Sequence, residues 1–118
     1  MLSIAERHKY ILEKLEKFGA EVTVCPFDVT AETLKTLNVD GIVLSDGPGD
    51  PRENTQLIEN LKEITALNIP VFGVALGHEL LALANGFEVR KMKYGHRGAN
   101  QPVKDLTTGR VYVTSQNH

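Results

Sequence analysis

The sequence predicts an α/β protein in three layers, with a mostly parallel sheet that carries helices on both of its faces. Short apolar runs such as 41–44 and 71–74 alternate along the chain with segments whose apolar residues recur at helical spacing. Each of these two runs leads into a glycine-rich turn. In a parallel sheet such turns meet at the edge formed by the carboxyl ends of the strands, where ligands bind. We expect a single domain over residues 1–118.

Composition limits the classes of function that are open to the chain. Of its 118 residues 42% are hydrophobic and 24% are charged, as is ordinary for a soluble globular domain. A net charge of −2 argues against nucleic acid as a partner, and no apolar run approaches the ~20 residues of a membrane helix. The single cysteine, Cys25, favours a reducing, cytoplasmic location, and we expect no signal peptide. Neither a metal nor another cofactor is expected, because ligand spacing is absent among His8, His78, His96 and His118.

The first third of the chain predicts a helix, a strand and a second helix. Ser3 and Glu6 form a capping box, apolar residues follow at helical spacing, and Gly19 is a typical helix stop. Residues 21–25 alternate in polarity, which predicts a strand. Thr30 is a typical N-cap for a short helix after it.

The middle of the chain predicts a strand followed by a helix. The compact apolar run 41–44 is typical of a strand buried on both faces of a parallel sheet. The loop 45–51 ends with Asp50 as N-cap and Pro51 at the first helical position, so we expect the helix to begin there. Its expected core face consists of Leu57, Ile58, Leu61 and Ile64.

The second half of the chain repeats this pattern and then departs from it. The apolar run 71–74 predicts a strand, and residues 76–84 predict a helix that ends before Gly86. Two further strands are expected at 87–89 and 110–114, on either side of a stretch without clear periodicity.

The turn between the strand 71–74 and the helix after it predicts a functional site. Gly73 and Gly77 flank its centre, as in a nucleophile elbow, where the apical residue has a strained backbone and neighbouring chain lies close by. The apical side chain would face the sheet's carboxyl edge above a helix N-terminus, which favours negative charge. The residue at the apex is Ala75, so this elbow carries no nucleophile.

Four segments of the chain form a recognisable set. They are Leu44-Ser-Asp-Gly-Pro-Gly-Asp-Pro51, Val71-Phe-Gly-Val-Ala-Leu-Gly-His-Glu-Leu-Leu-Ala-Leu-Ala84, Lys91-Met-Lys-Tyr-Gly-His-Arg-Gly-Ala-Asn-Gln-Pro-Val-Lys-Asp105 and Thr114-Ser-Gln-Asn-His118. Together they resemble the class I glutamine amidotransferase domain of carbamoyl phosphate synthetase small subunits. The resemblance implies a flavodoxin-like α/β fold.

The resemblance also implies an activity, a partner and a set of site residues. The family hydrolyses glutamine to glutamate and ammonia, and the ammonia passes to a large synthetase subunit that binds bicarbonate and ATP. By resemblance, Gly47 and Gly49 supply backbone to the substrate loop, Leu76 supplies an oxyanion N–H, and Asn117 contacts the substrate. Ala75 occupies the position of the family's cysteine nucleophile.

Three departures from the family lead us to expect an inactive chain. Ala75 has no nucleophilic atom, which closes the acyl-enzyme route. Glu79 stands where the family has a substrate-contacting glutamine and adds a negative charge beside the pocket. The family's catalytic His and Glu lie downstream of the segment that ends at His118, and we expect this domain to be partial.

Other interpretations stay open at this point. The chain could be a non-catalytic scaffold that keeps the fold and binds a partner subunit only. The turn at Gly47 and Gly49 could cradle a phosphate, although neither a Walker lysine pattern nor a GxGxxG accompanies it. The basic run 90–97 favours a solvated loop, with contact to the large subunit as the alternative. Structural roles are favoured for His78 and Cys25.

Overall fold

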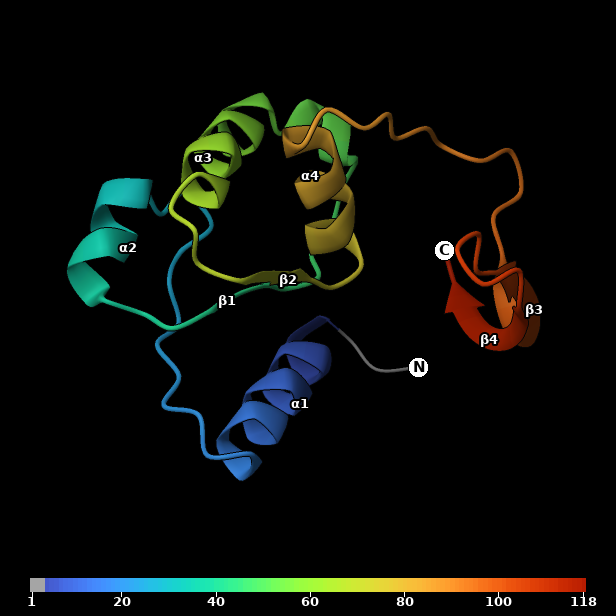
Figure 1. Ribbon diagram of the computed structural model, residues 1–118, viewed down its shortest axis with the longest axis horizontal. Coiled ribbons are helices and arrows are strands. Elements are labelled where there is room, and N and C mark those ends of the chain that lie inside the picture. Colours follow the sequence, from blue (N-terminus) through green and yellow to red (C-terminus); the bar gives the residue numbers. More distant parts are fainter. Residues whose placement is uncertain (1–3) are drawn as a thin grey trace.

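Two short parallel strands lie at the centre of the fold in the computed structural model, which describes residues 4–118 (Figure 1). They are β1 (Ile42–Leu44) and β2 (Val71–Gly73), and Val43 is paired with Phe72. Val43 and Phe72 are exposed, whereas the flanking residues of both strands are half-buried. The strand pair therefore has one face toward the core and one face that is largely open.

Three helices cover one face of the strand pair. They are α2 (Ala31–Leu37), α3 (Thr55–Thr65) and α4 (Leu76–Ala84), and they lie together on one side of β1 and β2 in Figure 1. Apolar residues at helical spacing meet there, as the sequence predicts. Their buried members are Ala31, Leu34, Leu61, Ile64 and Leu80.

The helix α1 (Ile4–Lys17) lies on the other side of the strand pair (Figure 1). The structure confirms its expected end. The N–H of Gly19 donates to the carbonyl of Glu16 at 2.9 Å, the N–H of Ala20 donates to that of Leu15 at 3.1 Å, and Gly19 has φ +86°. These bonds form a Schellman motif, which requires the left-handed conformation that glycine adopts without strain. The expected cap, Ser3, lies outside the described residues.

The predicted helix starts are confirmed at one position and shifted at the other. Thr30 caps α2, since its hydroxyl oxygen accepts the N–H of Thr33 at 3.3 Å. Asp50 caps a short 3₁₀ turn, η1 (Pro51–Glu53), and α3 begins only after Asn54. A 3₁₀ turn is a common way to enter a helix from a tight loop.

The strand predictions were wrong in part. Residues 21–25 and 87–89 form no strand, and Val24 and Phe87 are 73% and 69% exposed, so they lack the neighbouring strand that an alternating segment needs. The expected strand at 110–114 is confirmed as β4 (Val111–Asn117), and it pairs in an antiparallel hairpin with β3 (Arg97–Lys104), which the sequence did not predict. Within residues 4–118 the strands thus form two small sheets, and only one is parallel. The α/β class is confirmed, whereas a mostly parallel sheet is not seen.

The hairpin turn is organised by one carboxylate, that of Asp105. Its Oδ1 accepts the hydroxyl of Thr107 at 2.6 Å and the N–H of Thr107 at 2.8 Å, and its Oδ2 accepts the hydroxyl of Thr108 at 2.8 Å. Gly109, at φ +73°, closes the turn with an N–H bond to the Asp105 carbonyl. Hydrogen bonds from the Thr107 and Thr108 side chains lower the pKa of Asp105 from 3.8 to about 2.

Acid should therefore open the hairpin. A carboxyl whose pKa is lowered on folding stabilises the fold above its unfolded pKa, and this contribution is lost as the pH falls from about 4 toward about 2. We expect amide NMR signals of β3 and β4 to lose their dispersion over that interval. In Asp105→Ala the hairpin signals should be poorly dispersed at every pH, whereas Asp40→Ala, which removes an exposed carboxylate elsewhere, should titrate like the parent chain. A parent-like profile in Asp105→Ala would contradict the assignment.

Candidate functional site

The turn from β2 into α4 has the backbone of a nucleophile elbow. Ala75, at the N-cap position of α4, has φ 50° and ψ −113°, and its side chain is exposed. Residues with a Cβ rarely adopt this conformation, because it costs on the order of 1–3 kcal/mol. Ala75 directly precedes Leu76, the first residue of α4. The elbow expected from the sequence is therefore present in the structure.

Two glycines permit this turn because no side chain would fit at either position. A Cβ on Gly73 would lie 2.7 Å from the backbone N and Cα of His78. A Cβ on Gly77 would collide with the carbonyl oxygen of Leu44, the last residue of β1. The N–H of Val74 donates to that same carbonyl at 2.9 Å. The elbow is thus seated directly on the carboxyl end of the neighbouring strand.

The glycine loop that follows β1 reaches the elbow. A Cβ on Gly47 would lie 3.0 Å from Cδ2 of Leu76, the first residue of α4. Gly49 is exposed and has φ +99°, a conformation that glycine adopts without strain. As the first helical residue, Leu76 has no partner for its N–H within the helix. The loop and the helix N-terminus therefore lie side by side at the sheet's carboxyl edge.

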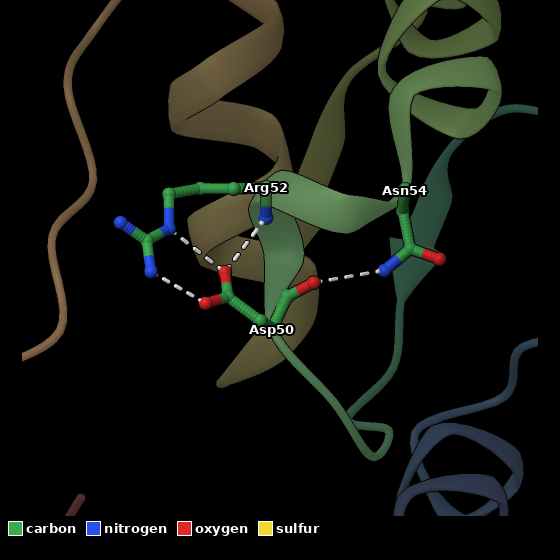
Figure 2. A network of polar contacts seen from close by, with 3 residues as sticks. All are labelled: Asp50, Arg52 and Asn54. Carbon is green, nitrogen blue, oxygen red and sulfur yellow. Dashed lines mark hydrogen bonds and ion pairs between the residues drawn. The ribbon is translucent and has the colours of Figure 1, made fainter.

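A short polar network fixes the far end of this loop (Figure 2). The Oδ1 of Asp50 accepts the backbone N–H and the Nε–H of Arg52, both at 3.0 Å, while its Oδ2 accepts an Nη2–H of Arg52 at 2.6 Å. The side-chain amide of Asn54 donates to the carbonyl of Asp50 at 3.2 Å. The Arg52 hydrogen bonds, and more weakly the charge of Lys91, lower the pKa of Asp50 from 3.8 to about 2.

The helix α1 contributes residues that the sequence analysis did not single out. Arg7 forms an ion pair with Asp46, which lies in the loop after β1, and the Nε2 of His8 lies 2.7 Å from the Asp46 carbonyl oxygen. Arg7, Asp46 and Ala75 line a hollow of about 250 Å³ together with Tyr10, Ile11 and Val74. Arg7 and Ile11 stand four residues apart, on one face of the helix. A charge on that face is the one signal that could have indicated this contact.

Two expected site residues lie outside the hollow beside Ala75. Glu79 is half-buried in the first turn of α4, and its N–H donates to the Ala75 carbonyl at 3.1 Å. It lines a second hollow of about 320 Å³, whose other walls include Arg90, Lys93 and His118. Asn117 is exposed and pairs with Arg97 in the hairpin, which stands apart from the elbow in Figure 1. The structure brings together Ala75, Leu76 and Gly47, but not Asn117.

This constellation has a counterpart in known proteins. A family model described as glutamine amidotransferase class-I matches residues 5–118, which is nearly the whole chain. The chain belongs to this family.

Curated relatives narrow the relationship within the class I glutamine amidotransferases. The chain is 52% identical over 108 residues to the carbamoyl phosphate synthase small chain of Bacillus cereus, covering 92% of this chain and 29% of the relative. It is 48% identical over 118 residues to the carbamoyl phosphate synthase small chain of Oceanobacillus iheyensis, an alignment that covers 100% of this chain and 32% of the relative. It is 49% identical over 108 residues to the carbamoyl phosphate synthase small chain of Methanopyrus kandleri, an alignment that covers 92% of this chain and 30% of the relative. The chain spans about 30% of the length of these relatives.

The chemistry open to the site at the elbow depends on backbone groups and on charge. The N-terminus of α4 offers N–H groups and the positive end of a helix dipole at the apex, which suits a developing oxyanion.

Among residues 4–118, no group of three or more His, Cys, Asp or Glu side chains could hold a metal ion. In the same part of the chain, no helix is long and apolar enough to cross a membrane.

Proposed function

We propose that this chain is a glutamine-binding amidotransferase domain of a carbamoyl phosphate synthetase small chain, and that it does not hydrolyse glutamine. The observation that carries the proposal is the backbone of Ala75, at φ 50° and ψ −113° between Gly73 and Gly77. This conformation is costly, and in an elbow it serves to present a nucleophile. Here it presents a methyl group, so no acyl-enzyme forms at this position.

The other expected residues have defined roles in this proposal. The N–H of Leu76 donates a hydrogen bond to the substrate's amide carbonyl, and the backbone of Gly47 and Gly49 forms the substrate loop beside it. Glu79 lies one turn along α4 and lines the second hollow, where its charge disfavours a nearby carboxylate. Asn117 contacts the substrate only if the hairpin moves toward the elbow.

The remaining proposals follow from the family. Residues 1–118 form a single, partial domain of a flavodoxin-like fold, in which further strands extend the β1–β2 pair into a three-layer, mostly parallel sheet. The partner is a large synthetase subunit that binds ATP and bicarbonate, and the location is cytoplasmic. The support is an identity of 48–52% to proteins named carbamoyl phosphate synthase small chain.

A non-catalytic scaffold is the second candidate, and the hairpin favours it. Val111 and Val113 in β4 are 61% and 68% exposed, and Leu106 in the turn is 88% exposed. Apolar residues so exposed on one small element are typical of a surface that another protein covers. In this alternative the chain binds a partner subunit through the hairpin and binds no glutamine.

A calorimetric titration separates the two candidates. We expect saturable binding of glutamine to the folded chain, with no ammonia released above a heat-killed control, because the backbone pocket is present and the nucleophile is absent. Glutamate serves as the matched ligand, since it differs only by a carboxylate in place of the amide. It should bind at least about tenfold more weakly, because it adds a negative charge within one helical turn of Glu79. Absence of glutamine binding in a chain shown to be folded by circular dichroism would favour the scaffold. Ammonia release would refute the inactive site.

A further inference from the structure

Asp46 is the one polar or charged residue classed as buried among residues 4–118, with 9% of its surface exposed. Its Oδ1 accepts the N–H of Gly47 at 2.8 Å, and its carboxylate forms the ion pair with Arg7. Its main-chain carbonyl oxygen faces Nε2 of His8 at 2.7 Å, so the histidine nitrogen must be the donor. Side chain and main chain of one loop residue are thus both held by neighbouring residues of α1.

Gly47 connects these contacts of Asp46 to the elbow. Gly47 follows Asp46 and lies against the Leu76 side chain, with room for no more than a strained Cβ. Arg7 and Asp46 also form part of the wall of the hollow beside Ala75. A nearly buried carboxylate is costly unless a charge and hydrogen bonds compensate it. Without Arg7, Asp46 would turn toward water and carry Gly47 with it.

We propose that Arg7 and His8 are positioning residues, through which α1 sets the place of the 46–49 loop at the glutamine pocket. The proposal rests on the proposed function, because the loop is taken to line the glutamine site. Arg7 directs the Asp46 side chain, and His8 fixes the orientation of the peptide group that precedes Gly47. Arg7 also lines the hollow beside Ala75, so the exchange rate of the Gly47 amide, and not affinity alone, reports the positioning role. The effect of Arg7 and His8 on binding is exerted through the loop backbone, which glycine residues leave flexible unless neighbouring groups hold it.

The test compares two charge-removing variants of the same helix. Arg7→Met removes the partner of Asp46, whereas Lys9→Met removes an equal charge from an exposed pair with Glu13, whose atoms are 3.7 Å apart. We expect Arg7→Met to weaken glutamine binding by about tenfold or more, since small displacements in a site have large effects. Its Gly47 amide should exchange with solvent about tenfold faster. Lys9→Met should stay within about twofold of the parent chain in both measurements.

Glutamine binding and amide exchange test the proposed function and the positioning role separately. If the parent chain binds no glutamine, the proposed function is refuted, and the exchange rate of the Gly47 amide still decides the positioning role. Equal exchange rates in Arg7→Met and Lys9→Met would overturn it. If Arg7→Met loses its helical circular dichroism, Asp46→Asn decides instead, because it keeps the size and the acceptor for Gly47 but removes the charge. Arg7→Lys should restore most of the affinity, which a loss of general stability would not explain.

Discussion

Gly77→Ala is expected to unfold the chain or to lower its Tm by roughly 10 °C or more. A Cβ at this position would collide with the Leu44 carbonyl oxygen and lie 2.7 Å from the Leu44 carbonyl carbon. Both are backbone atoms of a strand that is itself hydrogen-bonded to Val74, so neither can move aside without breaking the β1–β2 pair. Overpacking can lower the free energy of unfolding by about 3 kcal/mol, which is a large part of the ~5–15 kcal/mol typical of a domain.

Gly41→Ala is the matched control for this prediction. Gly41 directly precedes β1, its φ lies outside the left-handed region, and an added Cβ would meet only the Pro70 carbonyl at an ordinary 3.8 Å. The same substitution should therefore be neutral there, or should stabilise the fold by about 0.4–1 kcal/mol, because alanine lowers the conformational entropy of the unfolded chain. Thermal unfolding followed by circular dichroism measures both variants. Similar Tm values for the two would show that the elbow is not seated on β1 as described.

Much of the core half of the fold could be predicted from local signals. The spacing of apolar residues in α3 and the N-cap at Thr30 are local patterns, and each is confirmed. The elbow was predictable for the same reason, because two glycines around a short strand-to-helix turn imply a close backbone approach. These features depend on residues within one or two turns of one another.

The parts that sequence analysis missed depend on distant partners. The strand β3 has the sequence Arg-Gly-Ala-Asn-Gln-Pro-Val-Lys, which shows no alternation of polarity, and it becomes a strand because β4 pairs with it. Residues 21–25 do alternate, yet no neighbouring strand accompanies them among residues 4–118. The contact between His8 and Asp46 joins residues 38 positions apart, and no local pattern reports such a pair.

This division also explains the state of the candidate site. Local patterns placed the elbow at Ala75 and the glycine turn at Gly47 on one edge of the sheet, and the structure brings them together, with Leu76, which the resemblance added. Asn117 was assigned by resemblance alone, and it belongs to the hairpin, where it is paired with Arg97. The elbow half of the site is therefore preorganised by backbone packing, whereas Asn117 in the hairpin is not brought to it.

Ala75→Cys should convert the empty elbow into a reactive thiol. The substitution keeps a Cβ at φ 50°, so the backbone needs no change, and it places sulfur in an exposed position at the N-terminus of α4. The positive end of the helix dipole stabilises a thiolate, and cysteines so placed have pKa values of about 3.5–7.5 instead of about 8.5. In a Cys25→Ser background, we expect iodoacetamide to alkylate Cys at position 75 at neutral pH. The alkylation rate should rise with pH as the thiol ionises, with an apparent pKa below about 7.5.

Ala66→Cys, in the same background, is the control that isolates the elbow. Ala66 is also exposed at a helix end, but it is the C-cap of α3, where the dipole disfavours a thiolate. We expect alkylation at position 75 to be at least about tenfold faster near pH 7, and its pH profile to lie about one unit or more lower. This readout needs no other catalytic group, so it reports on the elbow alone. Equal rates and equal pH profiles at the two positions would mean that the turn at Ala75 does not activate a nucleophile, and the proposed origin of the inactive site would have to be abandoned.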